Sequence, residues 1–148
     1  MKNIRKITAL DTYPVRQAVL RKGKPLSTCL FDGDDLETTL HFGFFINTEL
    51  TGIISLYKKN NDAFTPNNQY QIRGMAALEH HQKKGIGAAL VLFCEDYCKK
   101  LLVDLIWFNA RTTAVAFYEK LGYQKTGMPF EIKEVGEHNL MFKNICTE

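Results

Sequence analysis

A glycine-containing turn near the middle of the chain is the first place where residue types and spacing indicate chemistry. A helix N-terminus exposes unpaired N–H groups and carries about half a positive charge, so a helix that begins in such a turn can bind an anion. Gly85 and Gly87 lack the Cβ atoms that would hold a phosphate group away from the backbone amides. The turn therefore indicates a phosphate or diphosphate site, and its residues are Gln82, Lys83, Lys84, Gly85, Ile86 and Gly87.

Two other phosphate-binding loops can be compared with this turn. A P-loop ends in Gly-Lys-Ser/Thr, whereas here Lys83 and Lys84 precede the glycine. A dinucleotide fingerprint needs a third glycine three positions after the second, and this chain has Leu90 there. Neither pattern fits. Taken by itself, the turn is equally consistent with a plain strand-to-helix connection whose lysines are solvated.

The hydrophobic pattern predicts the elements that hold this turn. Residues 70–78 predict a strand with a buried apolar end, and from Gly85 onward apolar residues at three- and four-residue steps predict a helix of about four turns. The other expected strands cover residues 2–9, 41–47, 51–58, 104–109, 123–126 and 138–143, and the other expected helices cover residues 13–20 and 113–121. The predicted order is β-α-β-β-β-α-β-α-β-β.

Turn-forming residues predict how these elements are connected. Asp11 and Thr12 are expected to cap the first helix, and Gly122 is expected to end the last one. Residues 48–50 join two strands into a hairpin. Residues 21–37 mix Gly, Pro and Asp so densely that they predict a substrate-facing loop with short helical pieces, and residues 60–68 predict a polar loop.

The composition is that of one folded domain covering residues 1–148. The chain is 45% hydrophobic and 24% charged, and its net charge of +3 comes from scattered residues, which favours a small anionic ligand over nucleic acid. No segment approaches the roughly 18 apolar residues of a membrane span, and the first residues contain no apolar signal region. We therefore expect a cytoplasmic protein that binds no membrane.

Histidines and cysteines are present in equal number, but their spacing does not suggest a metal site. The four histidines form no H-x-x-x-H or H-E-x-x-H pattern, and the four cysteines form no C-x-x-C pair. We therefore expect no metal and a reduced, intracellular setting. The residues are His41, His80, His81, His138, Cys29, Cys94, Cys98 and Cys146.

Two blocks of sequence are similar to the motifs of one enzyme family. Residues 75–78, followed by residues 82–87, match a Q/R-x-x-G-x-G/A pattern, and residues 114–123 contain Phe117 and Tyr118 followed by Glu-Lys-Leu-Gly and an aromatic residue. In this order and at this separation, the blocks resemble the GNAT N-acetyltransferase superfamily. The resemblance covers almost the whole chain. It implies an α/β (α+β) fold of three layers, with a central mixed, mostly antiparallel sheet of six to seven strands flanked by helices.

The resemblance also implies a site for acetyl-CoA as co-substrate. The fourth and fifth strands are expected to splay apart, and the pantetheine arm is expected to pair with the backbone of Met75, Ala76 and Ala77. Gln82 and Lys83 would line the entrance of the phosphate-binding turn. The amides expected to hold the pyrophosphate belong to Lys84, Gly85, Ile86, Gly87 and Ala88.

Some positions depart from the family pattern. Glu79 and Lys83 stand where proline and glycine are common, and Arg111 stands where asparagine is common. Asn109, at the end of the fifth predicted strand, offers a similar polar group. We expect both Asn109 and Arg111 to bind CoA.

For catalysis, the resemblance implies that Tyr118 is the general acid. A phenol with a pKa of about 10 can protonate a CoA thiolate once water is excluded. The alternative is that its ring only packs against the sheet. A backbone N–H near residues 75–77 would polarise the thioester carbonyl. Several family members have a strand glutamate as base where this chain has Gln71. A water relay is one possible route, and the base stays open. His80 and His81 are expected to be solvated loop residues.

The residues that could bind the acceptor substrate point to two different chemical groups. Four acidic residues could attract an ammonium group, and three arginines could bind a carboxylate. For the acidic run, a turn followed by a helix N-terminus is the favoured alternative. His138 is expected at a strand edge. The residues concerned are Asp32, Asp34, Asp35, Glu37, Arg16, Arg21 and Arg73.

The sequence thus predicts an enzyme that moves an acetyl group from acetyl-CoA to a primary amine of a small molecule or peptide, by direct attack in a ternary complex. A non-catalytic acyl-CoA-binding or sensing module is the main alternative, and a nucleotide-phosphate binder is a third. The acceptor and the oligomeric state stay open, and a homodimer is among the assemblies that the sequence allows.

Overall fold

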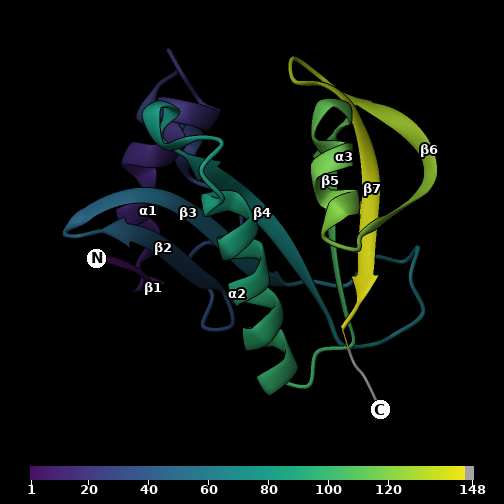
Figure 1. Ribbon diagram of the computed structural model, residues 1–148. Helices are drawn as coiled ribbons and strands as arrows, with labels where there is room; N and C mark the ends of the chain where they lie inside the picture. The colour runs from purple at the N-terminus through teal and green to yellow at the C-terminus, as the bar shows by residue number, and fades with distance from the viewer. Residues whose placement is uncertain (146–148) are drawn as a thin grey trace. The chain divides into compact units, whose positions relative to one another are not determined.

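The computed structural model describes residues 1–145 and contains seven strands in one mixed sheet, flanked by helices (Figure 1). The strands are β1 (Lys2–Ile7), β2 (Leu40–Ile46), β3 (Glu49–Lys58), β4 (Gln69–Ala77), β5 (Leu105–Arg111), β6 (Gln124–Ile132) and β7 (Gly136–Asn144). The helices are α1 (Ala9–Val15), α2 (Ile86–Lys100) and α3 (Val115–Lys120), with short helical turns η1 (Arg16–Leu20), η2 (Leu26–Cys29), η3 (Glu79–His81) and η4 (Thr112–Ala114). The predicted fold class and element order are confirmed.

The strand order in the sheet is β1-β2-β3-β4-β5-β7-β6. The described residues group into two compact units, one made of residues 1–58 and 72–97 and the other of residues 59–71 and 98–145. The expectation of a single domain over residues 1–148 stays a prediction. Among the described helices, none is long and apolar enough to span a membrane.

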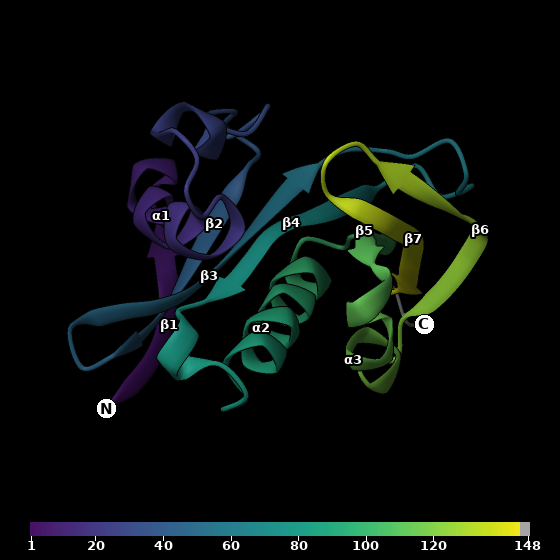
Figure 2. The same ribbon diagram turned by 90° about the horizontal axis from the view of Figure 1, so that it is seen from above.

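In the first unit, β1, β2 and β3 form an antiparallel meander. Ile53 packs with Val15 of α1, whereas its neighbour Gly52 faces Ile86 and Leu90 of α2. Because successive side chains of a strand point to opposite faces, the two helices cover opposite faces of this part of the sheet (Figure 2). On the α2 face, the Phe42 ring lies 5.0 Å from that of Phe93 and 5.1 Å from that of Tyr97.

The first helix begins earlier than predicted, at Ala9 instead of residue 13. Thr8 caps it, because its hydroxyl accepts a hydrogen bond from the Asp11 amide at 3.1 Å and its own amide donates to the Asp11 carboxylate at 3.0 Å. This reciprocal pair is a capping box. Asp11 therefore lies inside the first turn, and the expected Asp11 and Thr12 cap is wrong. The strand before the helix ends at Ile7 as a result.

The hairpin predicted between residues 41 and 58 is present, with a shorter connection than expected. Only Asn47 and Thr48 separate β2 from β3, and Asn47 has a φ of 55°. Two-residue hairpin loops need positive φ values, which asparagine tolerates well. The strand β3 therefore begins at Glu49, a residue that the sequence had placed in the turn.

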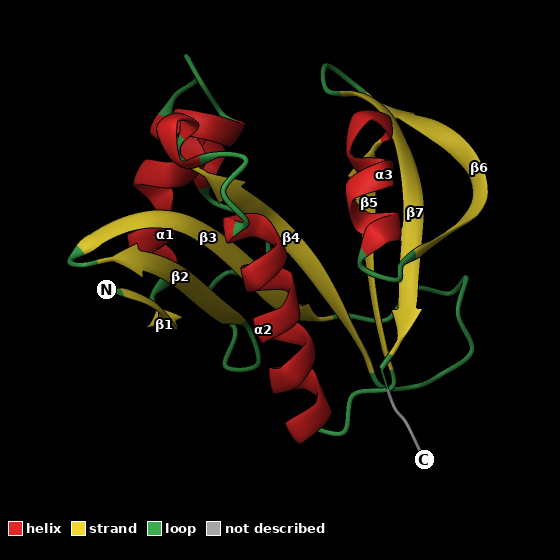
Figure 3. Ribbon diagram, viewed as in Figure 1, coloured by secondary structure: helices red, strands yellow, loops and turns green. Residues whose placement is uncertain are grey.

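In the second unit, β4 pairs in parallel with β5 from Gln69 to Gln71, and β7 lies between β5 and β6. The strand β6 continues to Ile132, well beyond the predicted end at residue 126 (Figure 3). Gly127 and Pro129 do not end the strand, because its pairing with β7 only shifts register between Thr126 and Phe130. Gly127, with a φ of 74°, accommodates this irregularity.

The close approach of α2 to β3 depends on Gly52, which generates our first prediction. A Cβ at this position would lie 2.6 Å from the Ile86 Cγ2 methyl and 3.3 Å from Leu90 Cδ1. Gly52→Ala should therefore lower the free energy of unfolding by about 1–3 kcal/mol, measured by urea denaturation. Adding Ile86→Leu, which removes the Cγ2 methyl, should restore part of the loss. An unchanged midpoint in Gly52→Ala would contradict the close packing.

Candidate functional site

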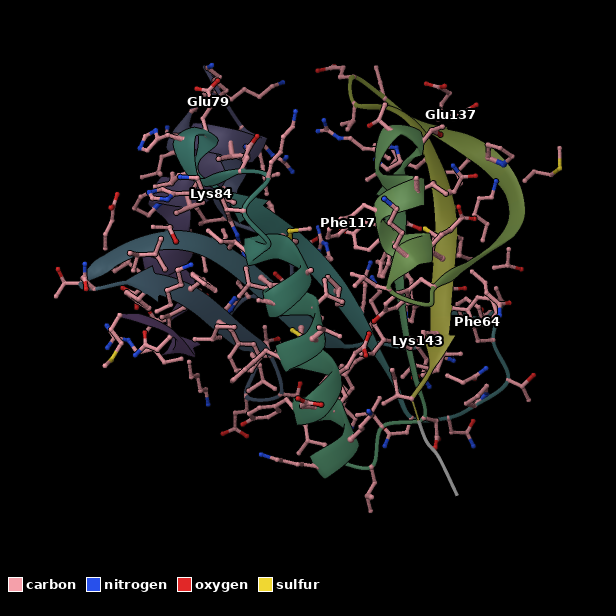
Figure 4. All side chains as sticks on the ribbon, in the orientation of Figure 1. Phe64, Glu79, Lys84, Phe117, Glu137 and Lys143 are labelled. Carbon is pink, nitrogen blue, oxygen red and sulfur yellow. The ribbon has the colours of Figure 1, made fainter. Side chains whose placement is uncertain are left out.

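The connection between β4 and α2 has the geometry of an anion site. The first hydrogen bond of the helix runs from the Ala89 amide to the Gly85 carbonyl at 3.0 Å, so the amides of the first helical turn have no partner within the helix. Gly85 has a φ of 83°, and a Cβ there would meet no atom within 4 Å. Figure 4 shows Lys84 on this exposed connection, which begins with the turn that carries Glu79. An anion can therefore reach these amides directly.

The part of this connection that follows β4 is held to the sheet by two hydrogen bonds. The Gln82 side-chain amide donates to the Ala77 carbonyl at 2.9 Å, and the Leu78 amide donates to the Thr51 carbonyl at 2.9 Å. Gln82 thus closes the loop onto the end of β4. Its expected contact with CoA stays a prediction.

The end of β4 is the predicted pantetheine strand. Ala76 is buried, and Met75 and Ala77 are partly exposed. The recorded pairing of β4 with β5 covers only Gln69–Gln71. Divergence of the two strands beyond this pairing stays a prediction, as does the role of residues 75–77.

Tyr118 lies in an aromatic cluster in the second unit. Its ring centroid is 4.3 Å from that of Phe108 and 5.0 Å from that of Phe117, which is labelled on α3 in Figure 4. Burial raises the pKa of Tyr118 to about 12. The phenol is therefore protonated at neutral pH, as a proton donor must be. The ring packs as the alternative prediction expected, and its acid role stays a prediction.

The remaining residues predicted for the second unit lie on β5 and β7. Asn109 and Arg111 are exposed on β5, opposite Leu140 and His138, and their roles stay predictions. His138 is buried in β7, and its Nδ1 atom lies 2.8 Å from the Gly136 carbonyl. Because β7 lies between two strands, the expected edge position of His138 is wrong.

A buried ion pair anchors the loop that precedes β2. Arg16 is completely buried, and its two terminal nitrogens donate to the Asp34 carboxylate at 2.7 and 3.1 Å. Arg16 also donates to the Cys29 carbonyl at 2.8 Å. Since Arg16 and Asp34 bind each other, neither is free to bind a substrate, and both suggested substrate roles are corrected.

Further side chains complete this polar network. Tyr57 donates to the Asp34 carboxylate at 2.6 Å, and burial, followed by this hydrogen bond, raises the pKa of Tyr57 to about 12. Burial alone would raise the pKa of Asp34, but hydrogen bonds from Arg16, Tyr57 and the Phe31 amide lower it below its ordinary value. The His41 ring lies 2.6 Å from the Ser55 hydroxyl and 3.0 Å from the Asp34 carbonyl. The network fixes residues 29–34 against β2 and β3.

Next to this network is a pocket of about 350 Å³. Phe31 lines it and also contacts β4, because a Cβ on Gly74 would lie 3.2 Å from the Phe31 ring. Arg73 stacks over Phe31 at 4.9 Å, while Asp32 and Asp35 remain exposed, so charges of both signs border the pocket. The acidic run forms turns, and the helix expected after it is absent. The lining residues are Tyr13, Leu30, Phe31, Asp32, Gly33, Asp34, Asp35 and Leu36.

Gln71 is buried in β4, and its Oε1 atom has no hydrogen-bond partner among the described residues. An amide oxygen cannot take up a proton at neutral pH, but it can accept a hydrogen bond from water or an amine. Gln71 is therefore no substitute for a glutamate base.

The chain is similar to known proteins in both sequence and fold. The pattern of the Acetyltransferase (GNAT) family matches residues 7–123. A Bacillus subtilis (strain 168) protein named uncharacterized N-acetyltransferase YitI is 31% identical over 147 residues, which cover 99% of each chain.

Two solved structures show the same fold at low identity. The ribosomal-protein-S18-alanine N-acetyltransferase from Escherichia coli has a TM-score of 0.79 at 20% identity, covering 100% of this chain and 96% of that one. An aminoglycoside 6'-N-acetyltransferase complexed with coenzyme A has a TM-score of 0.78 at 13% identity, covering 99% and 98%.

The buried ion pair generates the second prediction. Asp34→Asn leaves the Arg16 charge buried without its counter-ion, so the free energy of unfolding should fall by about 3 kcal/mol at neutral pH, measured by denaturant unfolding. Asp35→Asn, at the exposed neighbouring position, should change it by less than about 0.5 kcal/mol.

The pH dependence of this difference follows from the sign of the shift. Because folding lowers the pKa of Asp34, its stabilisation is present above the unfolded pKa of about 3.9 and is lost as pH falls through the folded value. The difference between the native chain and Asp34→Asn should therefore shrink below about pH 4. Equal losses in both variants, or a difference that grows in acid, would contradict the ion pair's role.

Proposed function

We propose, from the premise that this chain belongs to the GNAT family of acetyltransferases, that it transfers the acetyl group of acetyl-CoA to a primary amine of a small molecule or peptide. The observation that carries the proposal is the start of α2, where first-turn amides without helical partners follow an exposed turn with an open approach at Gly85. Such amides suit a diphosphate.

In this proposal, the amides of residues 84–88 bind the CoA pyrophosphate, and Lys83 and Lys84 add mobile positive charge beside it. The pantetheine arm forms hydrogen bonds with the backbone of Met75, Ala76 and Ala77. Asn109 and Arg111 contribute polar contacts from β5.

The chemical step is a direct attack in a ternary complex. The amine nitrogen attacks the thioester carbonyl carbon, a backbone N–H near residues 75–77 stabilises the oxyanion, and the C–S bond then breaks. Tyr118 donates its proton to the departing thiolate. The proton of the attacking amine leaves through water that donates a hydrogen bond to Gln71 Oε1, because the amide itself cannot act as a base.

The acceptor in this proposal enters through the pocket beside Phe31. Phe31, which lines this pocket, lies against Gly74, the residue immediately before the proposed pantetheine segment. In this proposal, an amine bound in the pocket therefore lies near the thioester. The described cysteines form no disulfide, which suits the reduced cytoplasmic setting that we propose.

Gly87→Glu tests the pyrophosphate site. A carboxylate suits the first turn of a helix, so the fold should be kept, while the pyrophosphate is repelled. Acetyl-CoA affinity, measured by calorimetry, should fall at least tenfold, which corresponds to about 1.4 kcal/mol. Leu92→Glu, which adds the same charge to an exposed position of the same helix, is the matched control and should keep the affinity. Failure of the native chain to bind acetyl-CoA would overturn the proposal.

Tyr118→Phe tests the acid. The ring and its packing are retained, so kcat should fall by about 10²- to 10⁴-fold while the KM for acetyl-CoA changes little. Tyr123→Phe removes a hydroxyl from a ring in the same aromatic cluster and should retain most activity. Unchanged turnover in Tyr118→Phe would exclude the acid role. Acetyl-CoA binding without turnover on any amine would instead favour a sensing module.

A further inference from the structure

Three side chains near the start of β3 form a cluster outside the proposed acetyl-transfer site. Glu49 is the first residue of β3, and His80 and His81 end the turn η3. Each offers one ligand atom, and these atoms all lie within 4.8 Å of one another. We propose that Glu49, His80 and His81 form a binding site for Zn²⁺ or a similar transition-metal ion.

The spacing of the two imidazole rings suits one tetrahedral ion. With Zn–N bonds of about 2.0–2.1 Å, two coordinated imidazoles have ring centroids about 5 Å apart, and two ligand atoms lie about 3.3 Å apart. The His80 and His81 centroids lie 5.1 Å apart. Nε2 of His81 lies 3.9 Å from Oε1 of Glu49, and the three ligand atoms all lie within 4.8 Å of one another. Binding one ion therefore requires these atoms to approach by about 0.5–1.5 Å.

The Glu49 side chain is able to make this approach. It is 58% exposed and makes no hydrogen bond within residues 1–145, so a rotamer change costs little. His80 is also exposed. The His81 side chain, by contrast, is only 16% exposed, so its surroundings restrict the position of its ring.

The hydrogen bonding of His81 is unusual for a mostly buried ring. Nδ1 is buried without a partner among the described residues, and Nε2 is too far from Glu49 for a hydrogen bond. Buried ring nitrogens normally have at least one partner. Neither ring nitrogen of His81 makes a hydrogen bond to a described residue, so the ring can coordinate a metal ion.

The ligand chemistry selects the ion. Two imidazoles and one carboxylate are the ligands that zinc takes in sites with three protein ligands and a bound water. Mg²⁺ and Ca²⁺ prefer oxygen ligands throughout. The simple alternative is a salt bridge between Glu49 and a protonated His81, which needs no metal.

The sequence did not indicate this cluster, because Glu49 and the histidines come from separate elements and no local spacing links them. A bound ion would join the start of β3 to η3, immediately before the turn of residues 82–87. It should therefore raise the melting temperature of the protein, since it binds the folded state.

Calorimetric titration of the tag-free full chain with ZnCl₂ tests the proposal. We expect one saturable site per chain and no comparable binding of Mg²⁺. Glu49→Gln and His80→Ala, both at exposed positions that should not affect folding, should each weaken Zn²⁺ binding at least tenfold. Glu79→Gln, which alters an exposed carboxylate in the same turn outside the cluster, should change the affinity less than twofold.

Co²⁺ absorption provides a second readout that excludes the cysteines. Coordination by His80, His81 and Glu49 gives ligand-field bands without thiolate charge transfer. Absence of saturable Zn²⁺ binding would overturn the proposal and favour the salt bridge. Equal losses in Glu49→Gln and Glu79→Gln, or a thiolate band with Co²⁺, would overturn it as well.

Discussion

Two structural constraints act on the start of α2, and the rest of the first unit satisfies both. The helix must lie close enough to β3 to bury Ile86 and Leu90, yet its first amides must stay open to solvent and ligand. Gly52 satisfies the first constraint, because any Cβ there would collide with Ile86. The hydrogen bond from Gln82 to the Ala77 carbonyl satisfies the second, because it fixes the loop without using the first-turn amides.

One departure from the family pattern lies in the same loop. Lys83 has a φ of 62°, a left-handed conformation that glycine adopts freely and a side chain makes less favourable. A glycine would relax the backbone there, whereas lysine adds a cation next to the proposed pyrophosphate site. In the same unit, the Arg16–Asp34 pair fixes the loop before β2. The two buried charges neutralise each other, and Phe31 lies against Gly74.

Periodicity and turn residues were enough to predict the elements around the site. The step from β4 to α2 and the order of all elements followed from local patterns. What the sequence could not show depends on partners distant in the chain: Arg16 with Asp34, Glu49 with His81, and Gly52 with Ile86. The predicted start of the first helix was wrong because Asp11 completes the cap from inside the helix. The predicted end of β6 was too early because the strand continues past Gly127 with a register shift.

We propose that backbone amides at the start of α2 bind the pyrophosphate of acetyl-CoA. An amide-resolved NMR titration with acetyl-CoA tests it directly, because each N–H reports its own environment. We expect the largest saturable shifts at Gly85, Ile86, Gly87 and Ala88, with desulfo-CoA producing the same pattern at these amides. Shifts that spare these four amides while others saturate would contradict the account.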